Sequence, residues 1–109
     1  MFKVVENPIV AWPVKITHQV DGKDVEGVFG VTFELLSDEE NDKLTDEDPS
    51  MKTLVMRVVK GWDEQVVGED SKPIPFSAEA LQKFISIGFR RMALVGAYQR
   101  AGLGVREKN

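Results

Sequence analysis

Residues 9 to 35, IVAWPVKITHQVDGKDVEGVFGVTFEL, decide the fold because they read as two strands joined by a tight turn. From Trp12 to Val20, apolar residues alternate with other residues, which is the two-residue period of a strand with one buried face. Asp21-Gly22 then supplies a strong hairpin turn signal. Alternation resumes at Phe29, Val31, Phe33 and Leu35. The stretch therefore predicts an antiparallel β-hairpin.

Four residues add detail to this hairpin. Pro13 has no N–H for a ladder, so we expect its strand at an edge of the sheet, or paired only beyond this residue. Gly27 and Gly30 predict a bulge or a close backbone approach in the second strand. His18 is the only histidine and lies on the apolar side of its strand, so we expect a structural role at the core edge rather than catalysis.

The rest of the chain favours helices. Ser37 and the acidic residues after it predict the capped start of a short helix. Asp46–Asp48 form an acidic break, and Pro49 suits the first turn of the next helix. From Met51 to Trp62 apolar residues follow a three-and-four spacing that predicts a helix, although paired valines leave a strand open as the alternative.

The C-terminal part continues the helical pattern. Residues 68–73 are polar and predict a loop or the tip of a small hairpin. After Ser77 we expect a helix that Gly88 ends or kinks, followed by a last helix over residues 89–101 that glycines 102 and 104 stop. Residues 105–109 are short, charged and expected to be mobile.

These elements predict one α+β domain over residues 1–104, with an N-terminal antiparallel β-hairpin packed against three or four α-helices. A length of 109 residues leaves no room for a second core. Two strands alone are marginally stable, so either a helix covers the sheet or another copy completes it, and self-association is one expectation.

Composition bounds the function. The chain is 42% hydrophobic, yet no apolar run approaches the roughly 20 residues of a membrane span. Asn7-Pro8 interrupts the N-terminal apolar residues, so we expect no secretory signal. We expect a cytoplasmic protein without membrane contact. The absence of cysteine excludes disulfides, thiolate metal sites and cysteine nucleophiles. The net charge of −4 is uneven, because residues 1–80 carry 8 Lys or Arg and 17 Asp or Glu, whereas residues 81–109 carry 6 and 1.

Motifs for catalysis are not found in the sequence. No serine or threonine has a base and an orienting acid at motif spacing, so we expect no enzyme and no cofactor. The acidic stretches 38–42 and 46–48 invite a divalent cation, but Lys43 and Leu44 stand where a calcium loop would continue. A helix cap and a solvated linker explain these acids better, and no metal site is expected.

Arginines and aromatics meet in the C-terminal quarter. Arginine beside aromatic rings can bind nucleic acid, but an acidic body with pI near 5.0 repels a long polyanion. The same residue types anchor protein interfaces. The expected partner contacts are Phe89, Arg90, Arg91, Tyr98 and Arg100. In the alternative interpretation, the arginines pair with the domain's own carboxylates and Tyr98 packs in the core.

The sequence also resembles a known family. The residues that carry the resemblance are Gly61-Trp62, the run from Pro73 to Leu81, Phe2-Lys3-Val4, Asp21-Gly22, Ala93-Leu94, Ala97-Tyr98 and Lys108-Asn109. This set of spaced positions, over nearly the full length, resembles the tail assembly chaperones of long-tailed bacteriophages and prophages. Within it, Trp62, Pro75, Phe76, Ser77 and Leu81 look like anchors and caps of the fold.

The resemblance implies a non-catalytic chaperone. Members of the family bind the tape measure protein, a long and mostly helical polypeptide, and keep it soluble until tube subunits assemble around it. In related systems a ribosomal frameshift adds a second domain that recruits the tail tube protein, and the segment after Gly104 would be a natural junction for such an extension. The alternative is a minor structural protein of the tail that stays in the virion.

Overall fold

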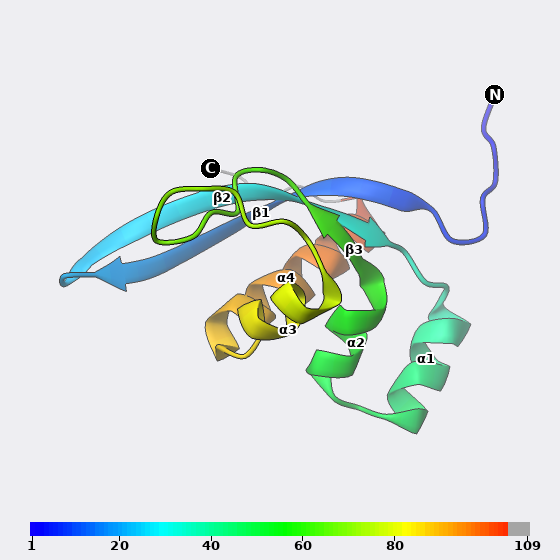
Figure 1. The fold of residues 1–109 in the computed structure, drawn as a ribbon. Coiled ribbons are helices and arrows are strands. Elements are labelled where there is room, and N and C mark those ends of the chain that lie inside the picture. The colour runs from blue at the N-terminus through cyan, green and yellow to red at the C-terminus, as the bar shows by residue number, and fades with distance from the viewer. Residues whose placement is uncertain (105–109) are drawn as a thin grey trace.

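The α+β prediction is confirmed by the structure, a computed structural model that describes residues 1–104. The predicted mobile tail, residues 105–109, lies outside the described residues. The elements follow the order β1 (Ile9–Val20), β2 (Lys23–Glu34), α1 (Asp38–Glu47), α2 (Met51–Val58), β3 (Val59–Trp62), α3 (Ala78–Phe84) and α4 (Gly88–Leu103). Figure 1 shows the long hairpin lying across the helices, with its tip extending beyond them.

The sheet has the order β1-β2-β3, and all neighbours are antiparallel. Asp21 and Gly22 both adopt positive φ, 51° and 76°, as a type I′ hairpin turn requires. Pro13 lies on the edge strand β1, as predicted. The β1–β2 register runs unbroken through both glycines of β2, so no bulge forms there. Gly30 nevertheless marks a close approach, because an added Cβ would lie 2.8 Å from Asp63 Oδ2.

The helix predicted from Met51 to Trp62 is wrong in its last four residues. α2 ends at Val58, and β3 follows without a loop, with Val59 already extended at φ −82° and ψ 121°. Residues of β3 pair with Val31 to Phe33 of β2, with a register shift between Thr32 and Phe33. The β-branched Val58-Val59 pair is compatible with helix and strand, and backbone pairing with β2 makes residues 59–62 a strand. The strand alternative therefore holds for residues 59–62.

Helix boundaries show which capping signals were interpreted correctly. Ser37 and Glu40 form the full capping box that begins α1. Pro49 precedes the cap of α2 and is not in its first turn, because Ser50 caps that helix through Lys52 N. Gly88 does not end α3; it is the first residue of α4. Gly102 lies inside α4, and Gly104 alone stops that helix, in the left-handed conformation at φ 70°.

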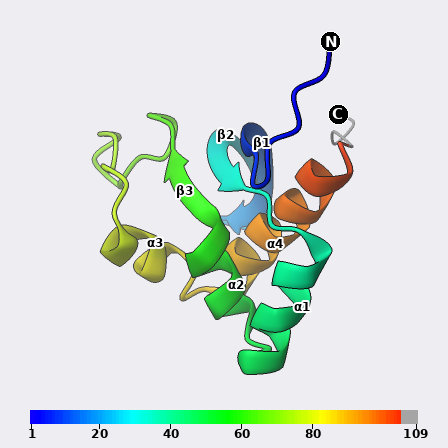
Figure 2. The same ribbon diagram turned by 90° about the vertical axis from the view of Figure 1, so that its right-hand side faces the viewer.

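The core lies between one face of the sheet and helices α2, α3 and α4, as Figures 1 and 2 show from two sides. Its four largest fully buried side chains are Phe33 of β2, Leu81 of α3, Ile85 directly after α3, and Leu94 of α4. Ser77 caps α3 as predicted, because its hydroxyl accepts a hydrogen bond from Ala80 N at 3.0 Å. The cap directs Leu81 of α3 into this core.

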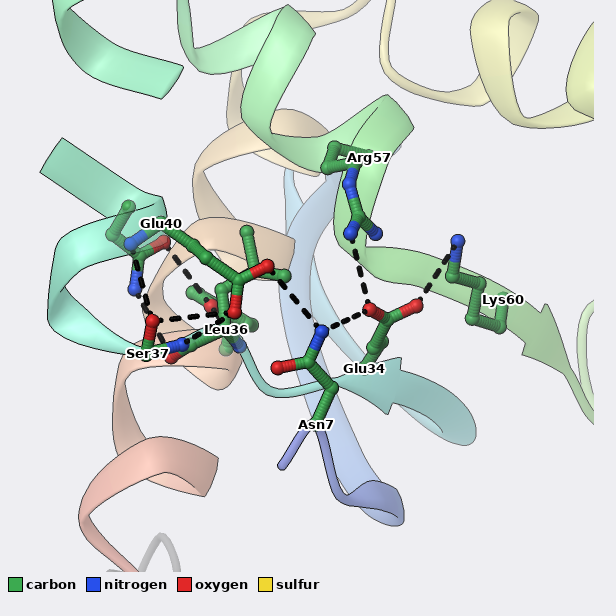
Figure 3. A network of polar contacts seen from close by, with 9 residues as sticks. Asn7, Glu34, Leu36, Ser37, Glu40, Arg57 and Lys60 are labelled. Carbon is green, nitrogen blue, oxygen red and sulfur yellow. Dashed lines mark hydrogen bonds and ion pairs between the residues drawn. The ribbon is translucent and has the colours of Figure 1, made fainter. Parts of the chain in front are cut away.

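A polar network ties the entry of β1 to the helices (Figure 3). Glu34 accepts hydrogen bonds from Arg57 at 3.1 Å and from the Asn7 amide at 3.0 Å, and Lys60 lies 3.5 Å from its second oxygen. Asn7 also donates to Glu40 at 3.4 Å. The hydrogen bond from Arg57 is the main cause that lowers the pKa of Glu34.

Candidate protein-binding groove

Two adjoining hollows lie between the hairpin, the segment after β3, and helices α3 and α4. The larger measures about 380 Å³ and the smaller about 200 Å³. They share Val66, Phe84 and Arg90. The larger hollow is also lined by Trp62, Ile74, Ser77, Glu79, Ala80 and Lys83. The smaller is also lined by Ile16, His18, Gly27, Phe29, Gln65, Val67 and Phe89. We call the two together the hairpin groove.

Trp62 lines the larger hollow and contacts several of the residues around it. Its indole Nε1 donates to the Ile74 carbonyl at 2.7 Å, which fixes the returning segment after the small turn at residues 68–73. Its ring meets Phe76 edge to face at 5.0 Å and Phe84 at 5.7 Å. Residues 68–73 form the hairpin tip that was one of the two predictions for this stretch, with a bridge from Val67 to Pro73. Aromatic contacts thus hold this wall of the larger hollow in place.

Arg90 stands where the two hollows meet. Its guanidinium lies 5.6 Å from the ring centre of Phe84 and 6.0 Å from that of Phe89, both within cation–π range. Within residues 1–104, Arg90 takes part in none of the ion pairs. Lys83, on the rim of the larger hollow, pairs with Glu79 at 3.6 Å. Arg90 therefore offers a positioned positive charge that contacts two aromatic rings and, in the described part of the chain, forms no ion pair.

The structure brings two of the five predicted contact residues into this groove. Phe89 and Arg90 line it, and Phe89 remains 47% exposed. The ring of His18 stacks on Phe89 at 6.1 Å, so this exposed histidine has a packing role at the edge of the groove.

The other three predicted residues lie elsewhere on α4. Arg91 donates to the Ile85 carbonyl at 2.9 Å and so braces the α3–α4 turn. Arg100 lies one turn beyond Gly96, where an added Cβ would be 3.3 Å from its Nη1.

Tyr98 is only 8% exposed and packs against Phe33. Its hydroxyl accepts from Leu36 N at 3.1 Å and donates to Asn41 Oδ1 at 3.3 Å. The structure thus places Tyr98 in the core, as the alternative interpretation has it.

Sequence reasoning missed Phe84 and Val66, which both hollows share. Phe84 follows the spacing of an ordinary helix core residue, and Val66 lies outside the helices and strands. Only the three-dimensional arrangement brings both to the groove. Gly27 was predicted to mark a bulge or a close backbone approach, and the structure shows neither at this residue. A Cβ there would meet nothing within 4 Å, so the glycine leaves space on the inner face of the hairpin.

The groove combines aromatic and apolar side chains with the guanidinium of Arg90. Within residues 1–104 no three acidic or histidine side chains gather into a potential metal site. The carboxyl groups whose pKa is lowered, Glu34 and Asp48, lie outside the groove. No helix of the described part of the chain has the length and apolar character to cross a membrane.

No family model, no curated protein and no solved structure matches this chain.

Proposed function

We propose that this protein is a phage tail assembly chaperone, which binds helices of the tape measure protein without catalysis and keeps them soluble in the host cytoplasm. The observation that carries the proposal is Arg90, held over Phe84 at the meeting of two apolar hollows. The sequence resemblance points to the same task. A chaperone of this kind needs an apolar docking surface and an otherwise charged exterior.

An amphipathic helix fits this groove in a defined way. Its apolar residues, at spacings of three and four, enter the larger hollow beside Trp62 and Phe84. An acidic residue on the same helix meets Arg90 and completes the ion pair that the domain itself does not supply. Burial of the apolar side chains provides affinity, and the charge pair sets register and orientation.

Co-purification with a tape measure segment tests the proposal. Arg90→Glu places a like charge against the acidic residue of the client, so we expect at least tenfold weaker retention. Lys52→Glu is the matched control, because it makes the same charge change at an exposed site on α2. Circular dichroism establishes that both variants fold. Equal retention of the two variants would remove Arg90 from the interface.

The second candidate is a minor structural protein retained in the tail. The basic C-terminal quarter of the sequence, whose arginines suit a permanent contact in an assembled tail, favours it. Mass spectrometry of purified virions separates the two functions. A chaperone is missing from finished particles, whereas a structural subunit is found there.

A further inference from the structure

The sheet has room for one more strand beside the outer half of β2. β3 pairs with β2 from Val31 to Phe33. Asp63 continues the pairing to Gly30, donating its N–H to the Gly30 carbonyl at 3.0 Å while its carboxylate accepts the Gly30 N–H at 2.8 Å. A hydrogen bond from Gln65 N to Asp63 Oδ1 then ends the strand pairing, and residues 65–67 line the hollows beside β2 without pairing to it. Among residues 1–104, no strand lies on this side of β2 before Gly30.

The backbone along this vacant edge is ready to pair. In a hairpin closed by a two-residue turn, Val20 and Lys23 exchange hydrogen bonds, and bonded pairs then alternate along the ladder. Glu26 and Val28 therefore direct their N–H and C=O groups away from β1. Both side chains are exposed, Val28 by 54%. This edge can accept an extended segment.

Hollows flank the vacant edge on both faces of the sheet. The smaller hollow of the hairpin groove lies on the inner face, where Gly27 lines it. On the outer face lies a hollow of about 370 Å³ lined by Ala11, Trp12, Pro13, Val28, Phe29, Gly30, Asp63 and Gln65. Both hollows include Phe29 and Gln65. A strand sends successive side chains to opposite faces, so a single added strand would fill both hollows.

The N-terminal segment has the composition of such a strand. Residues 1–5 form no helix or strand, and they carry exposed apolar side chains: Phe2 and Val4 are each 88% exposed and Val5 is 59% exposed. The segment extends away from the body of the domain (Figure 1). Phenylalanine and valine favour strands, and their exposed side chains are free to pack against another surface.

The segment cannot reach the vacant edge of its own chain. Asn7 is anchored to Glu34, and Phe2 lies five residues before Asn7, about 17 Å at full extension. Val28 lies six residues from Glu34 along β2, about 20 Å away. β3 occupies the intervening part of the same edge. An N-terminal segment that pairs with this edge must therefore come from another copy of the chain.

We propose that residues 2–5 of a second copy add to β2 as a fourth strand in line with β3. Phe2 and Val4 enter the hollow on one face, and Lys3 and Val5 face the other. We call residues 2–5 the donor segment and the vacant edge of β2 the acceptor edge. The two lie at different ends of the molecule, so the contact is heterologous and links copies head to tail. The buried area is small, and the association is weak and reversible. This proposal does not rest on the client protein, and it leaves the larger hollow open.

Variants of the donor and of the acceptor test the contact separately. Phe2→Asp with Val4→Asp removes the donor. Gly27→Ile fills the inner hollow, and Val28→Pro removes an N–H that the β1–β2 ladder does not use. Sedimentation up to about 1 mM protein should show self-association of the intact chain and monomers for each variant. Met51→Asp is the control, because it places an acid on an exposed apolar site of α2 and should associate normally.

Mixing the variants provides the decisive result. The donor variant keeps its acceptor edge, and Gly27→Ile keeps its donor segment, so the mixture should form one-to-one dimers and nothing larger. Val28→Pro and Gly27→Ile change the acceptor edge in different ways. Both variants must give the same result in the mixture, which excludes misfolding of one of them as the cause. An intact chain that stays monomeric at about 1 mM, or a mixture that stays monomeric, would overturn the proposal. So would association of the donor variant with itself.

Discussion

Replacing Tyr98 with phenylalanine isolates one hydroxyl that joins α4 to the connection between β2 and α1. The hydroxyl accepts from Leu36 N at 3.1 Å and donates to Asn41 Oδ1 at 3.3 Å. The ring contact with Phe33, at 5.8 Å between centres, survives in the variant. The substitution therefore removes hydrogen bonds and leaves the apolar packing in place.

The size of the effect follows from these two bonds. Leu36 is half-buried, so its N–H loses a partner that water replaces poorly, at a cost of about 1 to 2 kcal/mol. Asn41 can turn toward solvent, and its lost bond adds only a few tenths of a kcal/mol. For a domain of this size, each kcal/mol lowers the melting temperature by about 4 to 8 °C.

Urea unfolding followed by the fluorescence of the two tryptophans measures the change. We expect a lower midpoint with an unchanged m-value, because the compactness of both states stays the same. Gln99→Ala, at the exposed neighbouring position, is the control and should leave the midpoint unchanged. An unchanged midpoint for Tyr98→Phe, together with weaker client binding, would show that Tyr98 acts as a contact and refute its place in the core.

Two further predictions concern the sheet and the polar network. Gly30→Ala should destabilise the domain by about 1 to 2 kcal/mol in the same urea titration, because the added Cβ would lie 2.8 Å from Asp63 Oδ2. Gly27→Ala has open space around it, so we expect this variant to be neutral or slightly stabilising. Equal effects at the two glycines would contradict the close approach at Gly30. The pKa of Glu34 is lowered from its ordinary value of 4.5, mainly by the hydrogen bond from Arg57, so its contribution to stability is present above that value and is lost as pH falls through the lowered pKa. Unfolding midpoints between pH 7 and pH 3 should therefore fall less steeply for Glu34→Gln than for the intact chain, and parallel curves would argue against the network.

Local signals in the sequence predicted much of the fold. Alternation on both sides of Asp21-Gly22 specified the hairpin, since the turn fixes the register and the apolar side chains fix the buried face. Cap chemistry at Ser37 and Ser77 located the starts of α1 and α3. The end of α2 was missed, because Val58 and Val59 suit helix and strand alike and pairing with β2 chooses between them.

The candidate site was predictable only in part. Phe89 and Arg90 stood out because arginine and aromatics occur together, and both line the groove. No local pattern marks Phe84, Val66 or Gly27 as part of a groove, because they come together only when the hairpin, the segment after β3 and α3 are assembled. Tyr98 has the residue type of an interface anchor, yet its burial depends on packing that no local pattern reveals.

The most direct measurement is the solubility of a tape measure protein expressed with this chain. The gene for such a client is expected to be an unusually long open reading frame near that of this protein. We expect the client to stay in the soluble fraction with the intact chain and with Lys52→Glu, and to sediment with Arg90→Glu. A client that is equally soluble without the chain, or that Arg90→Glu keeps in solution as well as the intact chain does, would contradict the account.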